Sequence, residues 1–260
     1  MIFYFSCTGN TRWAAQELAR ATNERLINVA DALKSEEEFQ LAEGESLGFC
    51  FPVHGWRPPL TVREFIQRLK MDNWHDNYCY ALCTAGDTTG ESLKIFENDL
   101  LKRGVPLHAT FSLVMPESYV GLPFMDVDTS EKEKEKKLQA KLLLQQYIQH
   151  IINKKQGKQD PYIGRWPRIN SRLIGSFFVN HLISDKPFRV ESSKCVRCGI
   201  CANVCPTDNI KGGLGYEPTW LHTRRCITCF ACYHHCPHHA IEFGRQTQNK
   251  GQYWFTKNGI

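Results

Sequence analysis

Short apolar runs alternate with amphipathic segments over the first 154 residues. Five nearly continuous apolar runs, typical of strands covered on both faces of a sheet, span residues 2–6, 26–30, 46–51, 77–83 and 108–115. Helical patterns fall between most of them, at residues 12–22, 60–70 and 90–103, and a longer one covers residues 130–154. This order predicts an α/β fold with a doubly wound, five-stranded parallel sheet.

The pattern changes at residue 155. Residues 155–187 form a basic connector with a short helical pattern at 171–183, and residues 154–197 carry ten Lys and Arg against three acidic residues. Flexible tethers are usually rich in Gly, Ser or Pro, whereas this segment holds several large apolar side chains (Tyr162, Ile163, Trp166, Phe177, Phe178 and Leu182). We expect the connector to pack against the parts it joins; a loose tether is the alternative.

Composition and hydrophobicity indicate the cellular compartment. The chain has 260 residues, 42% of them hydrophobic, and a net charge of +5. No run approaches the ~20 apolar residues of a membrane helix, and the start does not resemble a signal peptide, so we expect a cytoplasmic protein that makes no membrane contact. Structural disulfides are rare in the reducing cytoplasm. The four scattered cysteines (Cys7, Cys50, Cys79 and Cys83) are therefore read as buried core thiols.

The other eight cysteines occur in two identical patterns. "CVRCGICANVCP" spans residues 195–206 and "CITCFACYHHCP" spans residues 226–237. Structural zinc is one interpretation, because paired CxxC units supply its thiolates. However, three cysteines at CxxCxxC can surround one iron–sulfur cluster while the fourth, before proline, reaches the other cluster. The doubled pattern therefore favours two [4Fe–4S] clusters over zinc.

On these motifs, residues 188–243 resemble a bacterial-type two-cluster ferredoxin, a small α+β domain. The resemblance implies crossed ligation. One cluster would be held by Cys195, Cys198, Cys201 and Cys236, and the other by Cys205, Cys226, Cys229 and Cys232.

A loop of small polar residues follows the first predicted strand. "FSCTGNT", residues 5–11, opens a helix, where free amides and the helix dipole bind phosphate. The loop is neither a Walker A motif nor GxGxxG, and a plain tight turn is the alternative. The loop resembles the phosphate loop of flavodoxins. The resemblance implies FMN, with its phosphate held by Ser6, Thr8, Gly9, Asn10 and Thr11.

Two later loops lie where flavodoxins surround the flavin ring, at the carboxyl ends of strands. The first is "PVHGWRPP" (52–59), with Pro52, Val53, His54, Gly55 and Trp56 as candidate contacts. Gly55 would present its carbonyl to flavin N5, and Trp56 would either stack on the ring or anchor its loop. The second is "TAGDTTG" (84–90), with Thr84, Ala85, Gly86 and Asp87, and Tyr119 of "MPESY" is a further candidate.

The whole chain resembles flavodoxin–ferredoxin fusion proteins of anaerobic bacteria and archaea. The implied parts are a flavodoxin-like FMN domain (1–154), the connector (155–187), the ferredoxin domain (188–243) and a tail of unassigned role (244–260). The implied function is electron transfer between two clusters and a non-covalent FMN, with other redox proteins as partners and no nucleic acid. The alternative is a flavin-dependent reductase of a small molecule that binds the open flavin face and receives electrons through the clusters.

Overall fold

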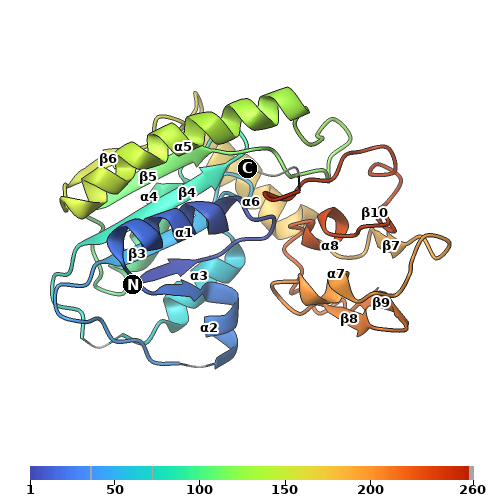
Figure 1. The fold of residues 1–260 in the computed structure, drawn as a ribbon, viewed down its shortest axis with the longest axis horizontal. Helices are drawn as coiled ribbons and strands as arrows, with labels where there is room; N and C mark the ends of the chain where they lie inside the picture. The colour runs from blue at the N-terminus through green and yellow to red at the C-terminus, as the bar shows by residue number, and fades with distance from the viewer. Residues whose placement is uncertain (36, 72, 258–260) are drawn as a thin grey trace.

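Six parallel strands form the central sheet in a computed structural model of the chain, which describes residues 1–35, 37–71 and 73–257 (Figure 1). Their order is β2-β1-β3-β4-β5-β6. The strands are β1 (Ile2–Tyr4), β2 (Leu26–Asn28), β3 (Leu47–Pro52), β4 (Cys79–Ala85), β5 (Ala109–Val114) and β6 (Gly157–Gln159). The predicted fold class is confirmed, with one strand more than expected because β6 of the connector pairs with β5.

Helices cover both faces of this sheet (Figure 1). They are α1 (Asn10–Thr22), α2 (Val29–Ser35), α3 (Leu60–Arg68), α4 (Ser92–Leu101) and α5 (Ser130–Ile152). Helices α1 and α5 pack together on one face of the sheet. On the other face, α3 contacts both α2 and α4. The apolar run at 26–30 does not stay extended, since α2 begins at Val29.

Strand side chains alternate between two apolar layers, as a pleated sheet requires. Phe3 and Phe49 face the layer of α2, α3 and α4. Ile2, Cys50 and Tyr147 of α5 belong to the opposite layer. Both faces are therefore buried, and the edge at the carboxyl ends of the strands is where the loops of the predicted flavin site gather.

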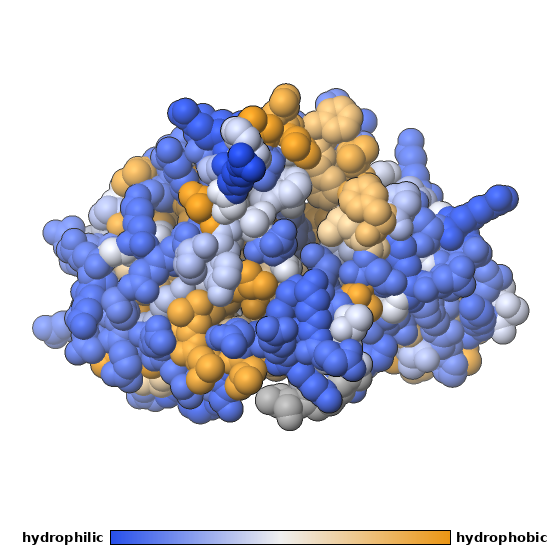
Figure 2. Space-filling model, turned by 90° about the horizontal axis from the view of Figure 1, so that it is seen from above, coloured by the Kyte–Doolittle hydropathy of each residue, from blue (hydrophilic) through white to orange (hydrophobic). Residues whose placement is uncertain are grey.

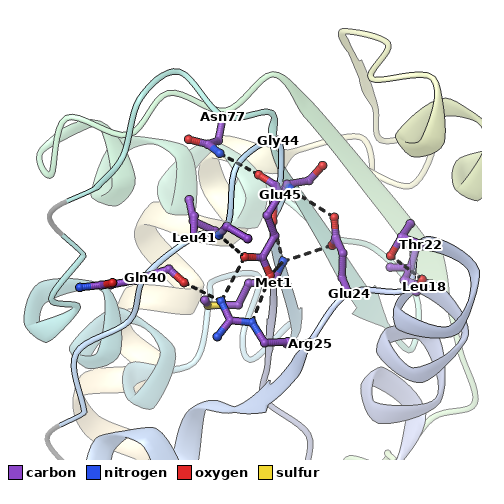
Figure 3. Close-up of polar contacts among 12 residues, drawn as sticks. Met1, Leu18, Thr22, Glu24, Arg25, Gln40, Leu41, Gly44, Glu45 and Asn77 are labelled. Carbon is purple, nitrogen blue, oxygen red and sulfur yellow. Dashed lines mark hydrogen bonds and ion pairs between the residues drawn. The ribbon is translucent and has the colours of Figure 1, made fainter.

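The amino ends of the strands hold a polar network (Figure 3). The buried terminal ammonium of Met1 donates to the carbonyl of Ser46 at 2.7 Å and lies 2.8 Å from Glu45. Arg25 donates to the same carboxylate through two nitrogens, at 3.2 and 3.0 Å. Bonds from these two cations stabilise the ionised form of Glu45 and, against the opposing effect of burial, bring its pKa down to about 2. This network lies at the end of the sheet opposite the candidate site.

The connector is packed, as predicted. After β6 it forms a helical stretch made of η1 (Ile169–Ile174), α6 (Gly175–Phe177) and η2 (Phe178–Leu182). Arg57 donates to the carbonyl of Ser171 at 2.8 Å, and Arg172 pairs with Glu91 at 2.6 Å. The solvent-facing side of the connector carries apolar residues, such as Leu173, which is 70% exposed.

Two small antiparallel ribbons and two short helices form the C-terminal part (Figure 1). The elements are β7 (Phe188–Val190), α7 (Ile200–Asn203), β8 (Ile210–Gly213), β9 (Tyr216–Trp220), α8 (Ala231–His234) and β10 (Ile241–Phe243). Strand β7 pairs with β10, and β8 with β9. Aromatic residues fill the core between them, so this is the expected small α+β unit.

The tail after β10 returns to the α/β part, where Phe255 stacks on Trp13 of α1. On the face seen in Figure 2, apolar side chains form separate patches within a mostly hydrophilic surface. Within the described ranges, no helix has both the length and the apolar character that crossing a membrane demands.

Candidate cluster and flavin sites

The predicted phosphate loop has unpaired donors at a helix start. Gly9, the N-cap of α1, has a φ of 98°, a left-handed conformation that favours glycine. Within the described part of the chain, the amides of Asn10, Thr11 and Arg12 have no hydrogen-bond acceptor. Three free N–H groups at the positive end of a 13-residue helix suit an anion. The loop therefore fits the terminal phosphate of a flavin nucleotide.

The side chains of this loop are less free than the sequence predicted. Asn10 donates through Nδ2 to the carbonyl of Pro116 at 3.0 Å. Thr11 and Thr84 share a hydroxyl–hydroxyl bond of 2.7 Å, and both are buried. These side chains brace neighbouring loops, which leaves the backbone amides as their anion contacts.

Ser6 and Thr8 complete the loop. Ser6 Oγ accepts a bond from the amide of Gly9 at 3.2 Å, and Thr8 Oγ1 lies 3.4 Å from Ser118 Oγ. Both hydroxyls have weak, local partners that a phosphate could replace. Their role as phosphate ligands stays a prediction.

The first predicted flavin loop forms a tight turn after β3. The amide of Val53 donates to the carbonyl of Thr84 at 2.8 Å, which ties this loop, from Pro52 onward, to β4. Gly55 and Trp56 both have a φ of 57°, and only glycine adopts that conformation at little cost. Burial lowers the pKa of His54 to about 4. Its ring is therefore neutral near pH 7.

Trp56 and Gly55 contact protein groups in this structure. The indole Nε1 of Trp56 donates to Thr88 Oγ1 at 2.9 Å, so the two flavin loops touch. The connector residue Gly175 lies so close to the carbonyl of Gly55 that a Cβ there would collide with it. The anchoring role considered for Trp56 is thus visible, while stacking on a flavin and a Gly55 contact to N5 stay predictions.

The second loop leaves β4 beside the loop that follows β5. Thr84 and Ala85 are buried at the strand end, and Asp87 is exposed. Gly86 has no room for a Cβ because the Glu117 carboxylate occupies that space, and its carbonyl accepts a 2.7 Å bond from Lys136. These contacts fix the loop at the edge of the sheet.

The first set of cluster cysteines lines one cavity. The lining of this cavity includes Cys195, Cys198, Cys201 and Cys236. Three of these belong to the first motif and the last to the second. The structure thus brings together the four residues that the crossed pattern predicted.

The second set lines a separate cavity, whose lining includes Cys205, Cys226, Cys229 and Cys232. Backbone amides donate to sulfurs of both sets: Asn209 to Cys205 at 3.3 Å, and Ala240 to Cys236 at 3.2 Å. Such bonds stabilise anionic thiolates and tune cluster potentials. Four thiols around a hollow, with amides directed at the sulfurs, fit a cubane cluster.

A mononuclear zinc site requires four ligands that converge on one ion. Among the residues that the structure describes, no group of three or more His, Cys, Asp or Glu side chains is placed to hold a single metal ion. Each predicted set of four cysteines lines a cavity of its own, as two separate clusters would require.

The second cysteine set lies against the phosphate loop. Cys7 and Cys229 pack against the same apolar layer of the α/β part, and the neighbouring Cys229 raises the pKa of Cys7. Ile227, inside the second motif, is 6% exposed and belongs to the apolar layer of α2 and α3. The interpretation of Cys7 as a buried core thiol is corrected: Cys7 packs against the core but is only partly buried, beside the second cysteine set. Cys50, Cys79 and Cys83 are buried in the core as expected.

Aromatic rings join the same two parts. The ring of Tyr119 meets Phe230 at 5.4 Å between centroids and the connector's Phe178 at 5.5 Å, both edge to face. Phe230 lines the second cavity. Burial raises the pKa of Tyr119 to about 12, so its phenol stays protonated. Tyr119 therefore lies between the flavin loops and the second cysteine set.

Comparison with known proteins agrees with the C-terminal assignment. Residues 188–237 match the family described as a 4Fe-4S dicluster domain. No curated protein matches the chain.

Three solved structures show limited similarity to parts of this chain. A candidate flavoprotein from Bacteroides uniformis is 18% identical, covers 44% of this chain and 88% of its own, and has a TM-score of 0.34. The Flv1 flavodiiron core from Synechocystis is 20% identical over 58% of this chain and 36% of its own, with a TM-score of 0.34. Rubredoxin oxygen:oxidoreductase from Desulfovibrio gigas is 15% identical over 57% and 35%, with a TM-score of 0.33.

Proposed function

We propose that this chain, a flavodoxin-like α/β domain joined to a 4Fe-4S dicluster domain, transfers electrons between two [4Fe–4S] clusters and a non-covalent FMN. The clusters would supply one-electron chemistry, and the flavin one- or two-electron chemistry. The residues of the chain hold these groups at fixed positions and tune them.

One observation carries this proposal: the predicted phosphate loop and the second cysteine set are neighbours at the junction of the two parts. Cys7 belongs to the loop and Cys229 is a predicted cluster ligand. Both pack against the same apolar layer, and Cys229 is near enough to Cys7 to raise its pKa. A flavin on that loop and a cluster on Cys229 would thus be neighbours within one chain. No diffusion step between molecules is then needed.

The order of the centres follows from the same geometry. The second set (Cys205, Cys226, Cys229 and Cys232) adjoins the α/β part through the buried Ile227. The first set holds Val196 at the corresponding position, and this residue is 56% exposed. We infer that the first set forms the outer cluster, where a redox partner exchanges electrons, and the second set forms the inner one.

The chain keeps the two parts in one arrangement. Lys34 of α2 pairs with Asp208 at 2.7 Å, and His234 of α8 donates through Nε2 to the carbonyl of Ser118 at 2.6 Å. The packed connector adds its contacts to the flavin loops. Fixed geometry favours transfer within the chain.

The reductase alternative requires a substrate cavity with polar donors on the flavin face. The groups closest to Gly55 from the connector are Gly175 and the ring of Phe178, which offer no polar side chain. The carrier function is therefore the one we favour.

Cofactor content tests the proposal. Anaerobically prepared protein is expected to hold about eight irons and eight sulfides, with one FMN per chain. Zinc without labile sulfide would contradict the clusters. Full iron content with no flavin uptake would contradict the flavin site.

A further inference from the structure

The end of the described chain lies on the phosphate loop. Residues 252–257, here called the strap, contact three consecutive loop residues. The amide of Phe255 donates to the carbonyl of Thr8 at 2.8 Å, and the Tyr253 hydroxyl donates to Asn10 Oδ1 at 2.6 Å. A Cβ on Gly9 would lie 2.9 Å from Cβ of Phe255. The loop and the strap therefore fit closely.

The strap is firmly seated. Tyr253 and Phe255 are two residues apart, as neighbours on one side of an extended chain are, and they are 3% and 5% exposed. Phe255 stacks on Trp13 at 5.2 Å. The ammonium of Lys137 donates to the Phe255 carbonyl at 2.7 Å and lies over the rings of Tyr253 and Phe255. Helices α1 and α5 thus anchor the strap.

The same segment also grips the cluster part. Gln252 donates to the carbonyls of Tyr233 and Cys236, at 2.6 and 2.8 Å. The amide of Tyr253 donates to Nδ1 of His234 at 3.1 Å. Since Cys236 is a predicted ligand of the outer cluster, the strap joins the cluster part directly to the phosphate loop.

Asn10 is the residue through which the strap acts. Its side chain is held at both ends, by the Pro116 carbonyl and by the Tyr253 hydroxyl. Its backbone amide is one of the three free donors at the start of α1. Donors that are fixed before a ligand arrives bind it more tightly, because no ordering cost is incurred on binding.

We propose that the strap is part of the flavin phosphate site. By holding Asn10 and Gly9, it fixes the free amides in an anion-binding arrangement and thereby raises affinity for a flavin with a terminal phosphate. Tyr253 is a positioning residue, since it acts on the phosphate through Asn10. The inference rests on the proposed function, because it concerns the FMN of that site.

Tyr253→Phe tests this proposal, with Tyr216→Phe as the matched control because Tyr216 is 75% exposed on β9. Flavin is removed from the full, cluster-loaded chain, and dissociation constants for FMN and riboflavin are measured by quenching of flavin fluorescence. We expect Tyr253→Phe to weaken FMN binding about tenfold, which is about 1.4 kcal/mol, and to leave riboflavin binding and iron content unchanged. The control should change nothing.

Two results would overturn the inference alone: unchanged FMN affinity, or equal losses for FMN and riboflavin. The second result would mean that the strap acts only on general stability. If neither flavin binds the unsubstituted chain, the proposed flavin site fails and the inference fails with it.

Hydrogen exchange of the unsubstituted chain provides a second test if Tyr253→Phe does not fold. FMN should slow amide exchange in both residues 8–13 and residues 252–257, and riboflavin should do so much less. Protection of the loop without protection of the strap would contradict the proposal.

Discussion

Ile227→Ala is the substitution that most directly loosens the junction between the two parts. Ile227 lies between the cluster cysteines Cys226 and Cys229, yet it is 6% exposed and packs in the α/β core. Its truncation leaves a cavity at the boundary. Buried Ile→Ala changes cost about 2–5 kcal/mol, and we expect about 3 kcal/mol here because the residue is almost fully buried.

At about 2–4 °C per kcal/mol for a chain of this size, the first thermal transition should fall by about 6–12 °C. Val196→Ala is the control, since Val196 holds the same place in the first motif but is 56% exposed. It should shift the transition by less than about 2 °C, as surface changes usually do. Differential scanning calorimetry of the cluster-loaded proteins measures both.

Electron transfer gives the second readout for Ile227→Ala. Looser docking should slow flavin reduction within the chain while iron and flavin content stay the same. An unchanged transition for Ile227→Ala, or equal shifts for both variants, would show that the junction is not packed as described and would refute the reasoning.

Three further predictions concern single residues. Cys205→Ser should disturb the spectrum of the inner cluster and Cys236→Ser that of the outer cluster, because each of these cysteines is expected to bind the cluster held mainly by the other motif. Electron paramagnetic resonance of the two variants would show the reverse if ligation is not crossed. Thr8→Glu should release FMN and keep iron, because a carboxylate repels the phosphate, and FMN retention at full stoichiometry speaks against the loop. Burial lowers the folded pKa of His54 to about 4, below an unfolded value of ~6.5. The free energy of unfolding is therefore unaffected by His54 above pH ~6.5 and decreases as pH falls toward 4, by up to about 3 kcal/mol. Denaturant unfolding of His54→Gln should show a flatter pH profile, and an unchanged profile would contradict this assignment.

The regular elements were predictable from the sequence because they bury continuous apolar runs. Strands β3, β4 and β5 match the runs at 46–51, 77–83 and 108–115, with ends that differ by at most two residues. Strand β6 has the polar sequence Gly157–Gln159 and forms only through pairing with β5, which no local pattern encodes. Helix α2 follows β2 without a break, so its start was hidden in one apolar run.

The cysteine sets were predictable because their spacing reflects ligand geometry, and each set lines one cavity. The contacts between the parts were not predictable, because they join residues more than 100 positions apart, such as Tyr119 with Phe230 and Asn10 with Tyr253. The aromatic sequence "YWF" at 253–255 was the one available signal of a buried tail. Asn10 and Thr11 were assigned as phosphate ligands through the resemblance of their loop to that of flavodoxins, and their side chains bind neighbouring loops in this structure.

Stopped-flow spectroscopy tests the central claim, that electrons pass between the clusters and the flavin inside one chain. The clusters of the holo-protein are reduced with a limited amount of dithionite, and bleaching of the flavin is followed at several protein concentrations. We predict a first-order rate that stays constant over a tenfold range of concentration, because the phosphate loop and Cys229 belong to one packed junction. A rate that rises in proportion to protein concentration would show transfer between chains and contradict the account.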